Sequence, residues 1–104
     1  MVEFVEIGKE AELRAEERVL IQIEDREILL IQHEGDFYAL ANLCSHDGEA
    51  LGDADVEDGE IICPRHGARF NLSSGAATGL PAVVGVPVYQ VKIEDGAVFL
   101  GISY

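Results

Sequence analysis

Hydrophobic and polar residues alternate along most of this 104-residue chain, which is the pattern of half-buried β-strands. Between positions 18 and 23, for example, Val19, Ile21 and Ile23 are separated by Leu20 and Gln22, and only Leu20 breaks the alternation. Strands are expected at 2–7, 18–23, 27–33, 37–40, 60–62, 69–72, 86–94 and 97–102. The pattern predicts an all-β fold, with an antiparallel sandwich or barrel as its base.

Turn-forming residues separate the expected strands, and the pair Asp95-Gly96 predicts a type I′ turn between the last two. Segment 9–17 is less clear because it is rich in Ala, Glu, Leu and Arg, which favour a helix. Its apolar residues Ala11, Leu13 and Ala15 alternate at period two, however, so a loop is expected there.

The length of the chain predicts one small domain, residues 1–104. The long strand patterns lie at both ends of the sequence and flank a middle segment with shorter ones. We therefore expect a base made of residues 1–42 and 83–104 and an inserted subdomain at 43–82.

The charge of the chain is strongly acidic, with 20 acidic and 7 basic residues and a formal net charge of −13. This argues against a nucleic-acid partner, because contacts to phosphates need Lys and Arg. Segment 47–60 holds seven carboxylates and no basic residue: Asp47, Glu49, Asp53, Asp55, Glu57, Asp58 and Glu60. We expect this run to steer the protein toward a basic docking surface and to keep it monomeric by like-charge repulsion.

The sequence has no apolar run of the length that spans a membrane, so no membrane partner is expected. It starts Met-Val-Glu-Phe-Val-Glu, without the basic and apolar regions of a signal peptide. A cytoplasmic location is expected, and thiols that bind metal suit that reducing compartment.

The cysteines and histidines provide the candidate chemistry. They occur as Cys44-Ser45-His46 and, after a gap of sixteen residues, as Cys63-Pro64-Arg65-His66; the only other histidine is His33. Two thiolates and two imidazoles can bind a metal. Zinc sites commonly group the two Cys and the two His, whereas here each short segment contains one of each. A structural zinc-binding module stays an alternative, but the mixture suits a cluster with two different irons.

The spacing C-x-H…C-x-x-H resembles the signature of Rieske-type ferredoxins, in which two His replace two Cys on one iron of a [2Fe–2S] cluster. The segments CSHDG, CPRHGARFNLSSG and GLPA extend the resemblance, whose specific part lies between positions 43 and 82. It implies that Cys44 and Cys63 bind one iron and that His46 and His66 bind the other. It also implies an antiparallel fold in which 43–82 binds the cluster, and in which Pro81 shields the cluster from water.

Two positions depart from the respiratory members of that family, which donate O–H bonds to sulfur from a serine and a tyrosine. The matching positions here are Ala68 and Phe70, and neither has a hydroxyl. The chain also lacks the additional cysteine pair of those proteins and a hydrophobic anchor. Because hydrogen bonds to the sulfurs favour the reduced cluster, the resemblance is to the soluble, low-potential branch.

The resemblance implies an electron carrier that is not itself an enzyme. It would carry single electrons from a flavoprotein reductase to a terminal oxygenase, as in ring-hydroxylating dioxygenase systems. A small Rieske subunit of an NAD(P)H nitrite reductase is the alternative. Catalysis by this chain alone is not expected, because an oxygenase needs a separate mononuclear iron site and only His33 remains to build one.

Overall fold

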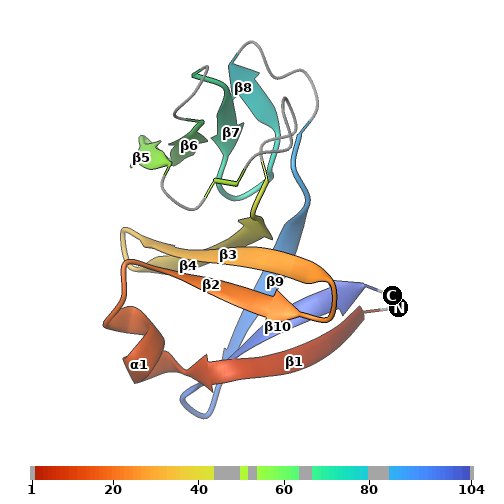
Figure 1. Cartoon of the computed structure of the whole chain (residues 1–104). Helices are drawn as coiled ribbons and strands as arrows, with labels where there is room; N and C mark the ends of the chain where they lie inside the picture. Colours follow the sequence, from red (N-terminus) through yellow and green to blue (C-terminus); the bar gives the residue numbers. More distant parts are fainter. Residues whose placement is uncertain (1, 44–49, 52–53, 64–66, 80–84, 104) are drawn as a thin grey trace.

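The computed structural model describes residues 2–43, 50–51, 54–63, 67–79 and 85–103 (Figure 1). Their elements are β1 (Val2–Lys9), α1 (Glu10–Arg14), β2 (Arg18–Ile23), β3 (Arg26–His33), β4 (Asp36–Ala41), β5 (Asp55–Glu57), β6 (Glu60–Ile62), β7 (Arg69–Asn71), β8 (Ala77–Gly79), β9 (Val88–Glu94) and β10 (Ala97–Ser103). The prediction of an all-β fold is confirmed, and every strand expected from the alternation is present within a few residues of its predicted bounds.

The strands form two antiparallel sheets. One has six strands in the order β1-β10-β9-β4-β3-β2, and the other has four in the order β5-β6-β7-β8. Figure 1 shows the smaller sheet packed beside the larger one, on the side of β3 and β4 and away from β1. The larger sheet takes its strands from both ends of the sequence, and the smaller sheet takes its strands from the middle.

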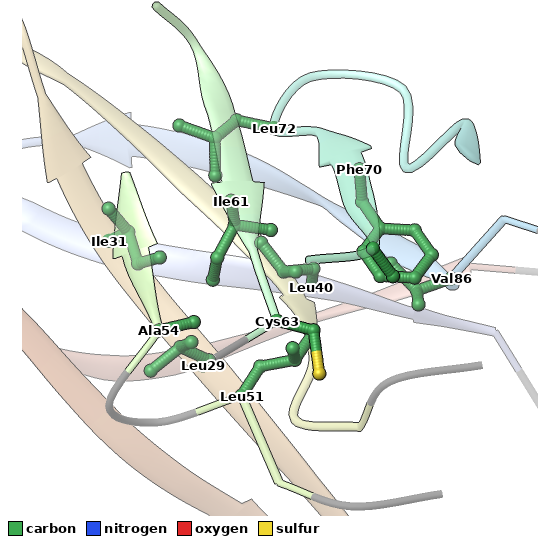
Figure 2. Packing of buried hydrophobic residues seen from close by; sticks show 11 residues of the cluster. Leu29, Ile31, Leu40, Leu51, Ala54, Ile61, Cys63, Phe70, Leu72 and Val86 are labelled. Carbon is green, nitrogen blue, oxygen red and sulfur yellow. The ribbon is translucent and has the colours of Figure 1, made fainter. Parts of the chain in front are cut away.

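Strand β3 lies between two hydrophobic cores. Ile28 and Leu30 point into the curled six-stranded sheet, where they pack with residues such as Leu100. Leu29 and Ile31 point the other way and pack with residues of the smaller sheet (Figure 2). All four β3 residues are at most 1% exposed, which explains why this strand reads as an unbroken hydrophobic run instead of an alternating one.

Three hairpins turn through a residue followed by glycine, with φ positive at both positions. The φ values are 52° and 85° at Glu34-Gly35, 52° and 77° at Asp58-Gly59, and 52° and 76° at Asp95-Gly96. Positive φ at both central positions is the geometry of a type I′ turn, so the prediction for Asp95-Gly96 is confirmed. The alternation missed β5, before Asp58-Gly59, and also β8, because each is three residues long and contains a single hydrophobic residue.

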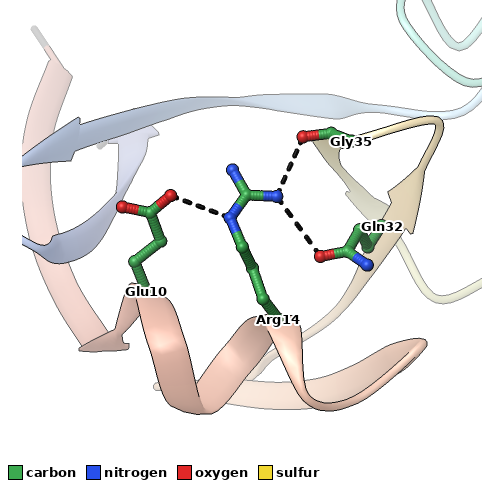
Figure 3. A network of polar contacts seen from close by, with 4 residues as sticks. All are labelled: Glu10, Arg14, Gln32 and Gly35. Atoms are coloured by element: carbon green, nitrogen blue, oxygen red, sulfur yellow. Dashed lines mark hydrogen bonds and ion pairs between the residues drawn. The ribbon is translucent and has the colours of Figure 1, made fainter.

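The loop expected at 9–17 is wrong, because α1 occupies Glu10–Arg14. Of its apolar residues only Leu13 is buried, so the period-two pattern did not mark a buried face. Arg14 holds the helix through its side chain: Nε lies 2.8 Å from Glu10 Oε2, and Nη1 donates to Gly35 O at 2.8 Å (Figure 3). Its guanidinium also lies 4.6 Å from the ring centre of Phe37. In the described part of the chain, no helix is long and apolar enough to span a membrane.

Candidate metal centre

Of the four predicted ligands, the structure describes Cys63; the other three, Cys44, His46 and His66, lie outside the described residues, as does Pro81. Cys63 follows the last residue of β6 and is fully buried. Figure 2 shows its sulfur pointing away from Ile61 and Leu72, toward the end of the core at which Leu51 lies.

The β6–β7 hairpin explains why Cys63 faces the core. Ile61 pairs with Phe70 across the two strands, and the ladder continues beyond Ile62 with a 2.7 Å bond from the Cys63 N–H to the Ala68 carbonyl. Because side chains alternate along a strand, Ile61, Cys63, Ala68 and Phe70 share one face, and all four are completely buried. Ala68 is therefore the residue directly opposite Cys63.

Backbone bonds join the described residues on either side of positions 64–66, where the predicted ligand His66 lies. Besides the Cys63–Ala68 bond, the N–H of Gly67 donates to the carbonyl of Cys63 at 3.0 Å. Gly67 has φ of 74°, which an L-residue adopts only at a cost. Gly67, which directly follows His66 in the sequence, thus lets the chain turn back toward β7.

Two further contacts close the segments on either side of this hairpin. Asn42 Oδ1 accepts a 2.9 Å bond from the N–H of Leu51, across the segment that holds Cys44 and His46. The N–H of Val86 donates to the Gly75 carbonyl at 2.8 Å, across the segment that holds Pro81. Sequence analysis did not single out Asn42 or Val86, because each acts on a backbone group that lies nine or more residues away.

Gly75 and Gly85 are glycines because two backbone segments touch there. A Cβ at Gly75 would lie 2.1 Å from the Val86 carbonyl oxygen, and one at Gly85 would lie 2.6 Å from the Gly75 carbonyl oxygen. Gly75 also has φ of 75°. The turn after β7 therefore packs directly against the backbone at 85–86, just before β9.

The charges around the small sheet are mainly acidic. Asp55, Glu57 and Asp58 are exposed on the β5–β6 hairpin. Glu60 differs from these three because a basic side chain compensates its charge. A hydrogen bond from the Thr78 side chain lowers the pKa of Glu60, and Arg69, with Nη1 3.3 Å from Glu60 Oε1, lowers the pKa further. The carboxylate of Glu60 therefore stays ionised at pH values below its ordinary pKa. Its contacts with Arg69 and Thr78 link β6 to β7 and β8.

The surroundings of Cys63 fit a metal-bound thiolate. Its neighbours in the core are hydrophobic side chains, among them Leu51, Ala68 and Phe70. An ionised thiol in such surroundings needs a compensating positive charge, which a metal ion supplies. A buried thiol three residues before an imidazole, with a second Cys/His pair nearby in sequence, provides the donor types that a [2Fe–2S] cluster with mixed ligands needs.

The family model for the Rieske [2Fe-2S] domain matches residues 3–90 of the chain. The protein therefore belongs to the Rieske family, and it carries one [2Fe–2S] cluster. Membership of this family sets aside the zinc alternative.

Several known proteins of similar sequence and structure are ferredoxins. The ferredoxin component of a naphthalene 1,2-dioxygenase system from Pseudomonas putida is 36% identical over 83 residues, which are 80% of each chain. The ferredoxin component of an alkene monooxygenase system from Xanthobacter autotrophicus is 31% identical over 96% of this chain and 82% of its own. The ferredoxin of carbazole 1,9a-dioxygenase from Nocardioides aromaticivorans superposes with a TM-score of 0.83 at 27% identity, covering 93% of this chain and 95% of its own. This chain is likewise a Rieske-type ferredoxin, an electron carrier rather than an enzyme.

Proposed function

We propose that the chain is the ferredoxin component of a multicomponent oxygenase, taking single electrons from a flavoprotein reductase and delivering them to a terminal oxygenase. The observation that carries this proposal is the match to oxygenase ferredoxins over most of both chains, 80% in the Pseudomonas putida case. We further propose that the protein works as a monomer in the cytoplasm.

The proposed ligands are Cys44 and Cys63 on one iron and His46 and His66 on the other, within a cluster-binding subdomain at 43–82. The bound cluster supplies one-electron redox chemistry. The chain's own part is to exclude water from the thiolate side, which the complete burial of Cys63, Ala68 and Phe70 supports. The acidic β5–β6 hairpin belongs to the same subdomain and suits a basic docking surface on the partners.

Neutralising the acidic hairpin is expected to slow electron transfer to the oxygenase. The test mixes reduced holoprotein with oxidised terminal oxygenase of a naphthalene dioxygenase system in a stopped-flow instrument, at several ionic strengths. For wild type the second-order rate falls as salt rises. In the variant Asp55→Asn/Glu57→Gln/Asp58→Asn the rate at low salt falls roughly threefold to tenfold, and it depends less on salt, because steering by the carboxylates is lost.

The matched control removes three charges away from the small sheet, with Glu6→Gln, Glu12→Gln and Glu16→Gln on or next to β1 and α1. It changes the net charge equally and is expected to keep most of the wild-type rate. Equal slowing of both variants would contradict a docking role for the hairpin. If wild-type holoprotein passes no electrons to the oxygenase but copurifies with a larger NAD(P)H nitrite reductase, the oxygenase proposal itself is wrong.

Adding the two missing hydroxyls is expected to raise the midpoint potential. Ala68 lies opposite Cys63, so a serine there places its hydroxyl on the thiol's side of the hairpin, and Phe70 lies on the same face. One hydrogen bond to sulfur worth about 1 kcal/mol raises a one-electron potential by about 40 mV. Redox titration of Ala68→Ser, Phe70→Tyr and the double variant, each with an intact visible spectrum, measures the effect.

The stability of each variant serves as the control for this prediction. Both positions are completely buried, so a new hydroxyl that finds no partner lowers the free energy of unfolding by about 1–3 kcal/mol. A potential that rises without such a loss means that the hydroxyl has reached sulfur. A potential that stays constant in stable variants would mean that the acidic run, not the absent hydroxyls, accounts for a low value.

A further inference from the structure

Asn42 is the one buried polar side chain among the residues that the structure describes, with 7% of its surface exposed. Both ends of its amide are used. Nδ2 donates to Glu27 Oε1 at 2.6 Å, and Oδ1 accepts from the N–H of Leu51 at 2.9 Å. The backbone N–H of Asn42 also donates to the Glu27 carbonyl at 3.0 Å. The two partners differ in burial: Leu51 is fully buried, so replacement of the amide oxygen leaves its N–H without a partner or water, whereas Glu27 is exposed.

The position of Asn42 in the chain places these bonds next to a predicted cluster ligand. Asn42 directly follows β4 and comes two residues before Cys44. Its partner Leu51 is fully buried in the core that also contains Cys63, and the Leu51 carbonyl accepts a 3.0 Å bond from Ala54. One side chain therefore ties the start and the end of segment 43–50 to each other and to β3.

Few other side chains can make this connection. The site needs an acceptor for the Leu51 N–H and a donor for the Glu27 carboxylate at the same time. Aspartate keeps the acceptor but faces Glu27 with a second negative charge. Leucine has a similar size but leaves the Leu51 N–H and the Glu27 carboxylate unpaired.

We propose that Asn42 is a positioning residue for the cluster, setting the geometry of the segment that holds Cys44 and His46 relative to the core that holds Cys63. The inference rests on the proposed assignment of Cys44 and His46 as ligands. Groups that orient metal ligands change the properties of the metal as well as its retention. Loss of the Asn42 bonds therefore alters the electronic structure of the bound cluster in addition to the stability of the fold.

The test uses holoprotein of wild type, Asn42→Asp and the exchange variant Asn42→Asp/Glu27→Gln. In Asn42→Asp the g-values of the reduced cluster in EPR are expected to shift, and release of iron to a chelator is expected to accelerate by about tenfold. In the exchange variant the new amide at position 27 can donate to the new carboxylate at position 42, so the bond between the two positions returns with donor and acceptor exchanged. Wild-type g-values and an iron release rate near that of wild type are expected there.

Leu13→Ala is the control for a purely structural role, because Leu13 is the buried residue of α1 and packs in the core of the larger sheet. It lowers stability and is expected to leave the g-values unchanged. Asn42→Asp holoprotein with wild-type g-values, or with iron release no faster than that of Leu13→Ala at equal stability, would overturn the inference. His46→Cys separates the two hypotheses: an unchanged EPR spectrum there refutes the ligand assignment, whereas a changed one with an unchanged Asn42→Asp spectrum refutes only the positioning role.

Discussion

Replacement of Cys63 by alanine is expected to leave the chain without its cluster. Wild-type protein purified anaerobically should contain about two irons and two acid-labile sulfides per chain, and the variant should contain almost none. Of the proposed ligands, Cys63 is the one described inside the hydrophobic core, and no other described side chain in that core can replace a thiolate. Iron and sulfide analysis, with the EPR spectrum of the reduced protein, measures the effect. The variant is also expected to unfold more easily, because binding of the cluster contributes to the stability of the fold.

Two histidine variants test the ligand assignment further, one at His33, which is not a proposed ligand, and one at His66, which is. His33 lies at the end of β3, with Nε2 3.9 Å from Glu34 Oε2, and His33→Gln is expected to keep full iron and an unchanged potential. His66→Cys is expected to lower the potential sharply if a cluster assembles, because a thiolate in place of a neutral imidazole adds negative charge to the cluster. A full complement of iron in Cys63→Ala, or loss of iron in His33→Gln, would show that the ligand set is wrong.

Replacement of Gly75 by alanine is expected to have the largest effect on stability of any single methyl group added to the described glycines. The new Cβ would meet the Val86 carbonyl oxygen at 2.1 Å, and backbone can relieve this contact only by moving. The movement stretches the 2.8 Å bond from the Val86 N–H to the Gly75 carbonyl, and the positive φ adds strain. Together these are expected to cost about 3 kcal/mol or more. For a domain of this size that lowers the melting temperature of the holoprotein by more than about 10 °C.

Gly96→Ala is the matched control for this prediction. Gly96 has φ of 76°, one degree from that of Gly75, but a Cβ there has no neighbour within 4 Å. It carries the backbone strain alone, so we expect a cost of about 1 kcal/mol and a shift of about 5 °C. Equal losses in the two variants, measured by circular dichroism at one heating rate, would mean that close approach of the backbone at Gly75 has little importance.

Much of the fold follows from signals that lie within a few residues of one another. Alternation along β2 and the Asp95-Gly96 pair predicted strands and a turn, and both are present. These short-range signals failed at segment 9–17, where the composition favours a helix but the apolar residues alternate at period two. The segment of α1 is helical because Leu13 is buried and Arg14 reaches Glu10 and Gly35, and the second of these contacts spans 21 positions.

Features of the candidate site that depend on nearby residues were likewise predictable from the sequence. The Cys/His spacing predicted the Rieske family and the cluster, since ligand types and short spacings are properties of the sequence itself. The alternation of Ile61 and Cys63, and of Ala68 and Phe70, is also local, and it places all four on one buried face once the hairpin forms.

What the sequence determined by itself is thus the class of fold, the turn at Asp95-Gly96 and the Cys/His pattern of the family, because each depends on neighbours along the chain. Only the tertiary structure decided that β3 separates two cores, that Asn42 joins Leu51 to Glu27, and that Gly75 lies against Val86. These contacts join residues nine to fifteen positions apart, or residues of different sheets. No local pattern encodes such pairings, because they exist only when the two sheets pack together and bury the polar groups between them.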